Sequence, residues 1–381
     1  MPAPAALDPA SFKCQRTANE VLWWQSAQSF DAHVAARGRL QPRETAYFRI
    51  GDELLELAVD EPSFLDSFRA RYGACELSSL NRASIPLIRC VVSAGYPSPL
   101  IAVYFLPGPP LDLATMALGL SHPPHGAPPH AISDAQRTGW SLIGGSDRAV
   151  AAASRTGLLI DPSSVADDFV ADYLVAATLS VQSNVMVLHA AALQLESSGA
   201  ILTGASHAGK TTTSMHLASR GHRLLGDELA VIRLGSRELL PLRRSLSLRA
   251  GPRSPDLARA LQGARTCEGR SVNGEIGPLR IDEVFSASGD EPVGLTAAFF
   301  LNGFSERPVI EPFDLTLNDE TAFDHMSANE VASISWGMTP QRRALRLLAL
   351  RQLMRRVRCW KLSVGPPDET AKLIESTLEA G

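Results

Sequence analysis

The sequence predicts an α/β fold built from two domains, and three observations carry this expectation. The chain has 381 residues, a Pro-, Gly- and His-rich stretch covers 107–130, and strands alternate with helices after residue 185. We therefore expect a separate N-terminal α+β domain at 1–130, a connection rich in Pro and Gly at 131–160, and an α/β domain at 161–381.

The first domain is predicted from short apolar patterns and turn residues. Gly51 and Asp52 interrupt an alternating run, which indicates a hairpin. The expected elements are a hairpin over 46–59, a helix over 62–72, and a second pair of strands over 87–94 and 100–106.

The second domain is predicted to begin with a helix and to continue as alternating strands and helices. The expected helices cover 163–181, 210–221, 339–358 and 368–378. The expected strands cover 185–195, 200–204, 222–228, 229–238 (the start of a hairpin), 295–302 and 359–365.

Residues 204–211 read Gly-Ala-Ser-His-Ala-Gly-Lys-Thr and fit the P-loop pattern G-x-x-x-x-G-K-[ST] at every position. Glycines allow the chain to curl so that backbone N–H groups point at a phosphate, and the following helix adds its dipole. Lys210 would neutralise phosphate charge, and the Thr211 hydroxyl could ligate Mg²⁺. The residues expected to contact the phosphates are Gly204, Ala205, Ser206, His207, Ala208, Gly209, Lys210, Thr211 and Thr212.

Asp227 and Glu228 lie at the C-terminal end of the strand expected directly after the loop helix. Ligands of open α/β sheets sit at this end of the strands, so one acid could hold Mg²⁺ and the other could take a proton from an attacking hydroxyl. The alternative is a pair of acids in a surface turn. His189 reaches the open side of the loop if its strand neighbours the strand before Gly204, and otherwise it is a core residue.

Composition disfavours several classes of partner. The net charge is −4, so no electrostatic pull toward nucleic acid or anionic membrane is expected. The start has no signal-peptide pattern, and no apolar run approaches the roughly 18 residues of a membrane span. The five cysteines are scattered without a C-x-x-C pair, which is typical of a reducing compartment. We expect a cytoplasmic protein that binds neither nucleic acid nor membrane.

Arginines gather at two further places. Arg243, Arg244 and Arg249 could grip phosphates or could lie on a solvated strand edge. The arginine-rich helix up to Arg358 could dock an acidic peptide, form a contact in a homo-oligomer, or present a solvated face.

Residues 188–232 resemble the core of the bacterial HPr kinase/phosphorylases. That family carries a His-Gly strand, a Gly-x-Ser-Gly-x-Gly-Lys-Ser loop, an Arg-Gly-His-x-Leu turn and an Asp-Asp pair. The chain matches at His189, at the turn 220–224 and at Asp227, and it departs at Ala190, Thr211 and Glu228. The pattern looks more like HPr-kinase-related proteins, some of which are serine kinases that tailor ribosomal peptides, including lasso peptides.

The resemblance implies a P-loop domain of HPr kinase/PEP carboxykinase type and an ATP- and Mg²⁺-dependent kinase. Its acceptor would be a hydroxyl, in particular a serine, of a protein or a ribosomal peptide precursor. Lys210 would act on the phosphates, Thr211 and Asp227 would hold Mg²⁺, and Glu228 would be the base, supported by His189. The longer Glu228 side chain leaves the opposite assignment open, with Asp227 as the base. A small-molecule kinase and a non-kinase ATPase or nucleotide sensor also stay open.

Overall fold

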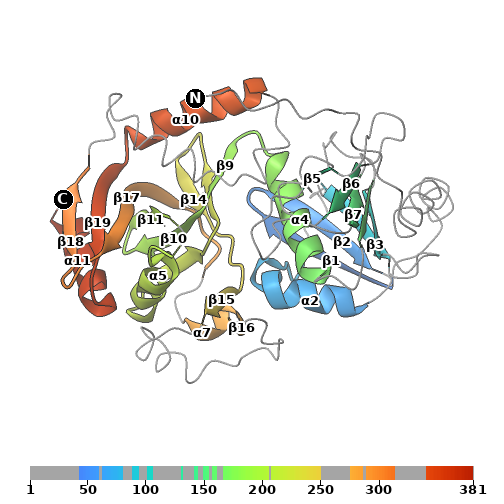
Figure 1. The fold of residues 1–381 in the computed structure, drawn as a ribbon, viewed down its shortest axis with the longest axis horizontal. Coiled ribbons are helices and arrows are strands. Elements are labelled where there is room, and N and C mark those ends of the chain that lie inside the picture. Colours follow the sequence, from blue (N-terminus) through green and yellow to red (C-terminus); the bar gives the residue numbers. More distant parts are fainter. Residues whose placement is uncertain are drawn as a thin grey trace, which may run out of the picture.

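The computed structural model of the chain forms a mixed α/β fold with two large sheets, one in each half of the molecule (Figure 1). The α/β class expected from the sequence is therefore confirmed, while the division into domains stays a prediction. The structure describes residues 43–59, 62–79, 88–93, 101–105, 130–131, 141–144, 149–153, 157–160, 166–205, 207–249, 275–285, 289–313 and 340–380.

The first sheet has eight strands in the order β1-β2-β3-β4-β8-β7-β6-β5. Only β2 and β3 pair in parallel among these neighbours, and all the others are antiparallel. The strands are β1 (Glu44–Ile50), β2 (Glu53–Val59), β3 (Ile88–Ser93), β4 (Ile101–Phe105), β5 (His130–Ala131), β6 (Ser141–Gly144), β7 (Ala149–Ala153) and β8 (Gly157–Ile160).

The local predictions for this half are confirmed where the residues are described. The hairpin forms β1 and β2, with Gly51 at a φ of 67° in the turn. The helix is α2 (Pro62–Tyr72), followed by a short 3₁₀ turn, η2 (Gly73–Cys75). The other two runs form β3 and β4, which pair with each other as expected.

The segment 131–160 differs from its prediction as a connection. It contributes β6, β7 and β8, which continue the sheet from β4. Each strand has only four or five residues, so its own pattern is too short to stand out beside the neighbouring Pro and Gly. These residues form strands because they pair with neighbouring strands, and not because of a local pattern in their sequence.

The second sheet has nine strands in the order β12-β10-β11-β17-β14-β13-β9, with β19 on β17 and β18 on β19. It is mixed, because β17 runs parallel to both β11 and β19. The strands are β9 (Val185–Leu188), β10 (Ala190–Leu195), β11 (Ser198–Gly204), β12 (Arg223–Gly226), β13 (Ala230–Arg233), β14 (Glu238–Leu240), β17 (Val293–Phe304), β18 (Val309–Pro312) and β19 (Arg358–Val364). A separate two-stranded sheet holds β15 (Leu246–Arg249) and β16 (Glu275–Leu279).

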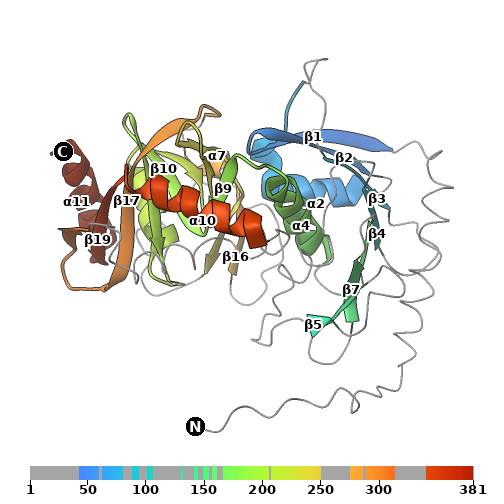
Figure 2. The same ribbon diagram turned by 90° about the horizontal axis from the view of Figure 1, so that it is seen from above.

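Helices cover both faces of the second sheet (Figures 1 and 2). One apolar cluster joins the sheet to α5 (Lys210–Ser219), α11 (Pro367–Glu379) and the short α7 (Ile281–Val284). A second cluster joins the opposite face to α10 (Pro340–Met354). Alternate residues of β10 serve the two clusters, as a buried strand requires.

The arginine-rich helix α10 is partly structural. Arg346 is buried and donates hydrogen bonds to the carbonyl oxygens of Gln182 at 3.2 Å and Val185 at 2.7 Å. These contacts tie α10 to the segment that follows α4 (Ala166–Ser180). The expected peptide or oligomer contact of this helix stays a prediction. None of the helices within the described ranges is long and apolar enough to cross a membrane.

A third apolar cluster joins the two halves of the molecule. It contains buried residues of β1, β2, α2 and α4 together with Val185, Val187 and Val231 of the second sheet. Since α2 belongs to the first half and α4 precedes the second sheet, this part of the interface is an apolar core. This core determines where α2 and α4 lie relative to the loop after β11.

Candidate active site

The three sequence signals meet at one edge of the second sheet. Strands β10 and β11 form an antiparallel hairpin that pairs Ala190 with Thr203, and β10 pairs Ala192 with Gly226 of β12. The start of β10 and the ends of β11 and β12 therefore lie together. We predicted that His189 reaches the loop if its strand lies beside the strand before Gly204, and this pairing of strands is confirmed.

His189 itself differs from the single strand expected over 185–195. The chain bends at this residue and separates β9 from β10. The reason lies in the pairing, because β9 pairs with β13 whereas β10 pairs with β11 and β12. His189 is a bend residue at the edge of the sheet and not part of a continuous strand.

The loop after β11 has the backbone conformation that its glycines suggest. Gly204 has a φ of 152° and Gly209 a φ of 98°, and His207 also has a positive φ of 64°. The Ala208 N–H donates to the Ala205 carbonyl oxygen at 3.2 Å, which closes a turn within the loop. The predicted strand before the loop and helix after it are both present, as β11 and α5, and Ser206 lies outside the described residues.

Lys210 folds back over this loop. Its ammonium donates to the carbonyl oxygens of Gly204 and Ala205, both at 3.0 Å. Burial lowers the pKa of Lys210, and the negative charges of Asp227 and Glu228 oppose that shift. The ammonium therefore lies in the mouth of the loop, close to both acids.

Asp227 is buried, with 6% of its surface exposed, and lies against the first turn of α5. Its Oδ2 accepts a hydrogen bond from the Thr211 hydroxyl at 2.8 Å, while its Oδ1 has no hydrogen-bond partner among the described residues. Burial raises the pKa of Asp227, and the Thr211 hydrogen bond and the Lys210 charge act in the opposite direction. A buried carboxylate oxygen without a partner, beside a hydroxyl, is a chemically suitable pair of ligands for a hard cation.

Within the described ranges, no three His, Cys, Asp or Glu side chains gather in a way that could hold a metal ion. Thr211 and Asp227 supply two protein oxygens, as in sites where Mg²⁺ takes its other ligands from phosphates and water. The two residues thus fit the metal role expected of them, but only together with a phosphate ligand.

Glu228 differs from Asp227 in environment although the two are adjacent. Its φ of 65° is unusual for a residue with a Cβ, and its side chain is 47% exposed. The His189 ring forms a hydrogen bond with the Glu228 backbone. Burial and the Lys210 charge lower the pKa of His189, which favours a neutral ring at neutral pH.

Arg244 connects Glu228 to the other half of the molecule. One of its guanidinium nitrogens lies 2.5 Å from Glu228 Oε2, and the other lies 3.3 Å from Asp172 Oδ2 on α4. Asp172 also accepts two hydrogen bonds from Arg71, at 3.0 and 2.8 Å, and one from the Tyr72 hydroxyl at 2.7 Å. Burial raises the pKa of Tyr72 well above its usual range, and the negative charge of Asp172 acts in the same direction. We call these five residues the Glu228–Asp172 network.

The sequence contained no signal for most of this network. Arg71 and Tyr72 belong to a predicted helix and lie about 100 residues before Asp172, with no recognisable motif at any of the three. Only the packing of α2 against α4 brings them to Arg244. Arg244 itself was among the arginines singled out as possible phosphate ligands, and the structure pairs it with Glu228 instead.

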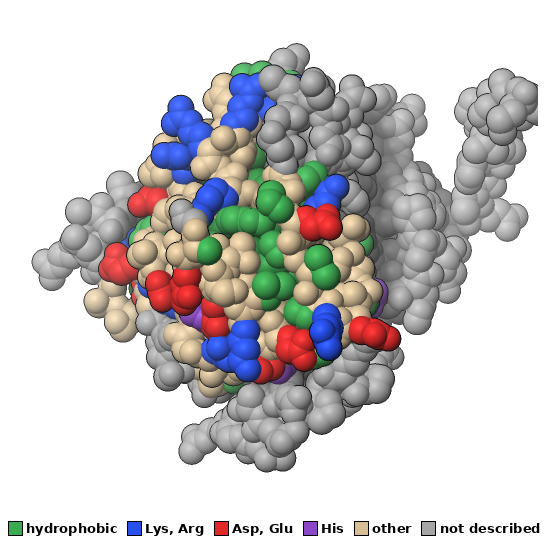
Figure 3. All heavy atoms as spheres, turned by 90° about the vertical axis from the view of Figure 1, so that its left-hand side faces the viewer, with side chains coloured by type: hydrophobic (Ala, Val, Ile, Leu, Met, Phe, Trp, Pro, Cys, Tyr) green, Lys and Arg blue, Asp and Glu red, His purple; other side chains and the backbone are tan. Residues whose placement is uncertain are grey.

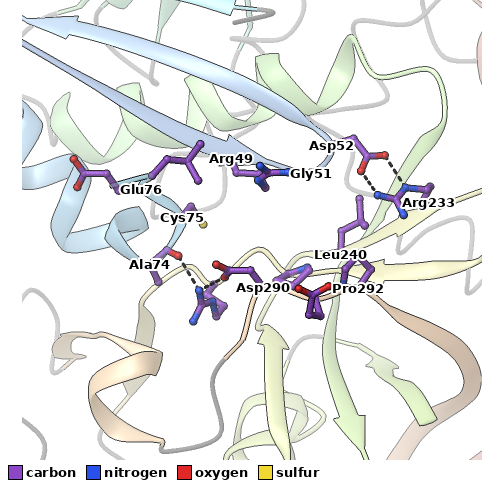
Figure 4. Close-up of a pocket in the computed structure, with 14 residues that line it drawn as sticks. Arg49, Gly51, Asp52, Ala74, Cys75, Glu76, Arg233, Leu240, Asp290 and Pro292 are labelled. Atoms are coloured by element: carbon purple, nitrogen blue, oxygen red, sulfur yellow. Dashed lines mark hydrogen bonds and ion pairs between the residues drawn. The ribbon is translucent and has the colours of Figure 1, made fainter. Parts of the chain in front are cut away.

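Arg243 points away from the loop, contrary to the expectation that it could grip phosphates. It donates to the Ala74 carbonyl oxygen at 3.0 Å and pairs with Asp290 (Figure 4). These contacts border a cavity of about 340 Å³ between the first half and the second sheet. The Arg244 N–H donates to the Leu242 carbonyl oxygen at 2.9 Å, which forms a tight turn at Arg243, and the two arginines reach different partners. The side chain of Arg249 lies outside the described residues.

No protein-family model matches the chain, and no curated protein matches it. Among solved structures, the chain is similar to the Hpr(Ser) kinase/phosphatase from Coxiella burnetii, with 15% sequence identity and a TM-score of 0.25. That similarity covers 51% of this chain and 94% of the other. At this TM-score the likeness carries no argument about activity.

Proposed function

We propose that the chain is a kinase that uses ATP and Mg²⁺ and transfers the γ-phosphoryl group to a hydroxyl, in particular a serine of a protein or ribosomal peptide precursor. The observation that carries the proposal is the pair of unlike acids beside one phosphate-type loop. Asp227 is buried and bonded to Thr211, whereas Glu228 is adjacent but 47% exposed. One acid suits a cation and the other suits an acceptor arriving from outside.

The phosphates would be held by the backbone of the loop and by Lys210. Gly204 and Gly209 provide the backbone torsions, and α5 directs its N-terminal N–H groups toward the loop. Thr211 and Asp227 would hold Mg²⁺, which when bound neutralises charge on the phosphoryl oxygens. Lys210 would exchange its carbonyl contacts for phosphate oxygens.

Glu228 would act as the base. Its carboxylate would accept the proton of the acceptor hydroxyl while the hydroxyl oxygen bonds to the γ-phosphorus. The bond from that phosphorus to the β–γ bridging oxygen breaks, and ADP leaves. Arg244 directs the carboxylate, and the His189 hydrogen bond supports the Glu228 backbone in its unusual conformation.

The exposure of Glu228 supports a large acceptor over a small one. A small-molecule kinase encloses its acceptor in a pocket, whereas a kinase for polypeptides needs an open surface beside the base. The Glu228–Asp172 network runs from this surface to α2 and α4. We therefore assign recognition of the acceptor to the N-terminal part of the chain, 1–130, and transfer to the part from 161 onward.

The direct test is incubation of the full chain with Mg²⁺ and ATP labelled at the γ-phosphate, together with polypeptides encoded by neighbouring genes. Label on a serine of one polypeptide is the expected result. Label released only as inorganic phosphate would identify an ATPase, and label in a small molecule would identify a small-molecule kinase. Either result would overturn the proposed acceptor class.

Replacing Gly204 by alanine should lower nucleotide affinity by about 10-fold or more, because strain of this kind costs on the order of 1–3 kcal/mol. An added Cβ would lie 2.8 Å from the Leu301 carbonyl oxygen, and the φ of 152° disfavours any side chain. Gly235→Ala is the matched control, since its Cβ would meet nothing within 4 Å. Calorimetric titration of MgATP into both variants checks this, and equal affinities would contradict the loop geometry.

Replacing Asp172 by asparagine should lower phosphoryl transfer by about 10- to 100-fold with nucleotide affinity unchanged, since small misplacements of reacting groups have effects of this size. The substitution removes the charge shared by Arg71 and Arg244. Asp66→Asn on α2 is the control, because Asp66 is 76% exposed and lies 3.9 Å from Arg69. Steady-state rates and MgATP titration distinguish the two effects, and a loss of nucleotide affinity would assign the network to the loop instead.

A further inference from the structure

A half-exposed aromatic ring lies beside the loop on the side away from the acids. Phe304 ends β17 and is 52% exposed. A Cβ built on Gly209 would lie 3.5 Å from the Phe304 Cε1 atom, and 3.7 Å from the Val364 Cγ1 atom at the end of β19. The ring therefore borders the residue at which the loop passes into α5.

The order of the strands separates this ring from the catalytic acids. Neighbouring strands follow the order β12-β10-β11-β17, and β19 lies beyond β17. The acids follow β12, on one side of the loop after β11, and Phe304 ends β17, on the other side. A triphosphate held by the loop must direct its terminal phosphoryl group toward Asp227 and Glu228. Its nucleoside must then leave on the other side, over the ends of β17 and β19.

The backbone around Phe304 is held in place. The Ser305 N–H donates to the Val364 carbonyl oxygen at 2.9 Å. A Cβ on Gly365 would clash with the Pro308 nitrogen, so the turn after Phe304 packs directly on the end of β19. A backbone fixed in this way keeps the ring beside the loop, so less conformational freedom is lost when a flat ligand stacks on it.

Hydrophobic side chains are exposed on the face of the molecule that carries β18, β19 and α11 (Figure 3). Phe304 and Val309, on β17 and β18, the two strands that flank β19, are the large exposed hydrophobic residues of this region among those described. An aromatic face in this position provides the surface on which a nucleobase stacks, because every base has a complementary π-face.

We infer that Phe304 is the stacking platform for the nucleobase of the phosphate donor, with Val364 on its border. This inference rests on the proposed use of a nucleotide. It assigns a binding role to the end of β17, outside the loop and the acids. Phe304 does not touch the reacting atoms, so its effect is on binding of the nucleoside and not on transfer as such.

The test compares a ligand that has a base with one that has none. MgATP and Mg-tripolyphosphate are titrated into the full chain carrying Phe304→Ala, Phe304→Trp or no change. Phe304→Ala should weaken MgATP binding by about 5- to 150-fold, the range measured for base–aromatic stacking, and should leave tripolyphosphate binding unchanged. Phe304→Trp should keep MgATP affinity, and its fluorescence should change on binding ATP but not tripolyphosphate.

Leu348→Ala is the matched control, because Leu348 is 56% exposed on α10, which covers the opposite face of the sheet from α5. The Leu348→Ala variant should bind MgATP and Mg-tripolyphosphate with the same affinities as the unchanged chain. Equal MgATP affinity in Phe304→Ala would overturn the stacking role while leaving the proposed function in place. A parallel loss of tripolyphosphate binding would also overturn it, since the ring would then shape the loop. Absence of binding of both ligands to the unchanged chain would instead remove the proposed function.

Discussion

Replacing Lys210 by alanine is expected to lower phosphoryl transfer by at least about 10²- to 10³-fold, the effect of removing a group that stabilises developing charge. The fold should remain intact, because among the described residues the ammonium donates its hydrogen bonds to the carbonyl oxygens of Gly204 and Ala205, and Lys210 is not a member of the apolar clusters. Transfer from γ-labelled ATP measures the first effect, and thermal unfolding measures the second.

Lys372→Ala is the matched control for that substitution. Lys372 is 59% exposed on α11 and pairs with Asp368 one turn away at 2.6 Å, so its removal should leave transfer unchanged. A Lys210→Ala variant that keeps full activity would contradict the phosphate role of the loop. One that unfolds would show that Lys210 acts on stability.

Asp227→Asn and Glu228→Gln are each expected to lower transfer by at least about 10²-fold, the lower end of general acid–base contributions. The two variants should differ in binding. Asp227 accepts a hydrogen bond from Thr211, the other proposed Mg²⁺ ligand. Asp227→Asn should therefore also lose the Mg²⁺-dependent part of nucleotide affinity. Glu228→Gln should keep it, because the proposed base acts on the acceptor. Titration of ATP with and without Mg²⁺ separates these results.

Asp227→Asn should also change the stability of the fold. Because burial raises the pKa of Asp227, its charged form is unfavourable in the folded chain. Stability should therefore fall as pH rises from the unfolded pKa of about 4 through the raised folded value. Asp227→Asn removes this penalty, so it should unfold at a higher temperature than the unchanged chain at neutral pH. The difference should vanish below about pH 4.

Two exposed acids provide controls for these substitutions. Asp66→Asn and Glu311→Gln make the same chemical changes at exposed positions and should affect neither transfer nor binding. Unchanged turnover in both Asp227→Asn and Glu228→Gln would refute the site. Loss of Mg²⁺-dependent affinity in Glu228→Gln alone would exchange the two roles.

Local patterns in the sequence were sufficient for the loop and its flanking elements. Eight consecutive residues specify the loop, because the torsions of Gly204 and Gly209 depend mainly on the absence of a Cβ. The strand before the loop and the helix after it follow from short-range periodicity. The hairpin of β1 and β2 and the helix α2 were predictable for the same reason.

Patterns of that kind could not specify which strands are neighbours. The bend at His189 arises because β9 and β10 pair with different strands, although the apolar run is continuous. The short strands β6, β7 and β8 exist through pairing alone. Periodicity reports which face of a strand is buried, but it carries no information about the partner.

The identity of Asp227 and Glu228 as neighbours of the loop was visible in the sequence, but their different environments were not. Burial of Asp227 depends on the approach of α5, and the direction of Glu228 depends on Arg244 and Asp172. Phe304 reaches the loop because β17 pairs in parallel with β11 from nearly a hundred residues away. The sequence by itself determined the loop, since backbone torsions are local; the tertiary structure decided what surrounds it, since burial and charge pairing arise only when distant segments pack together.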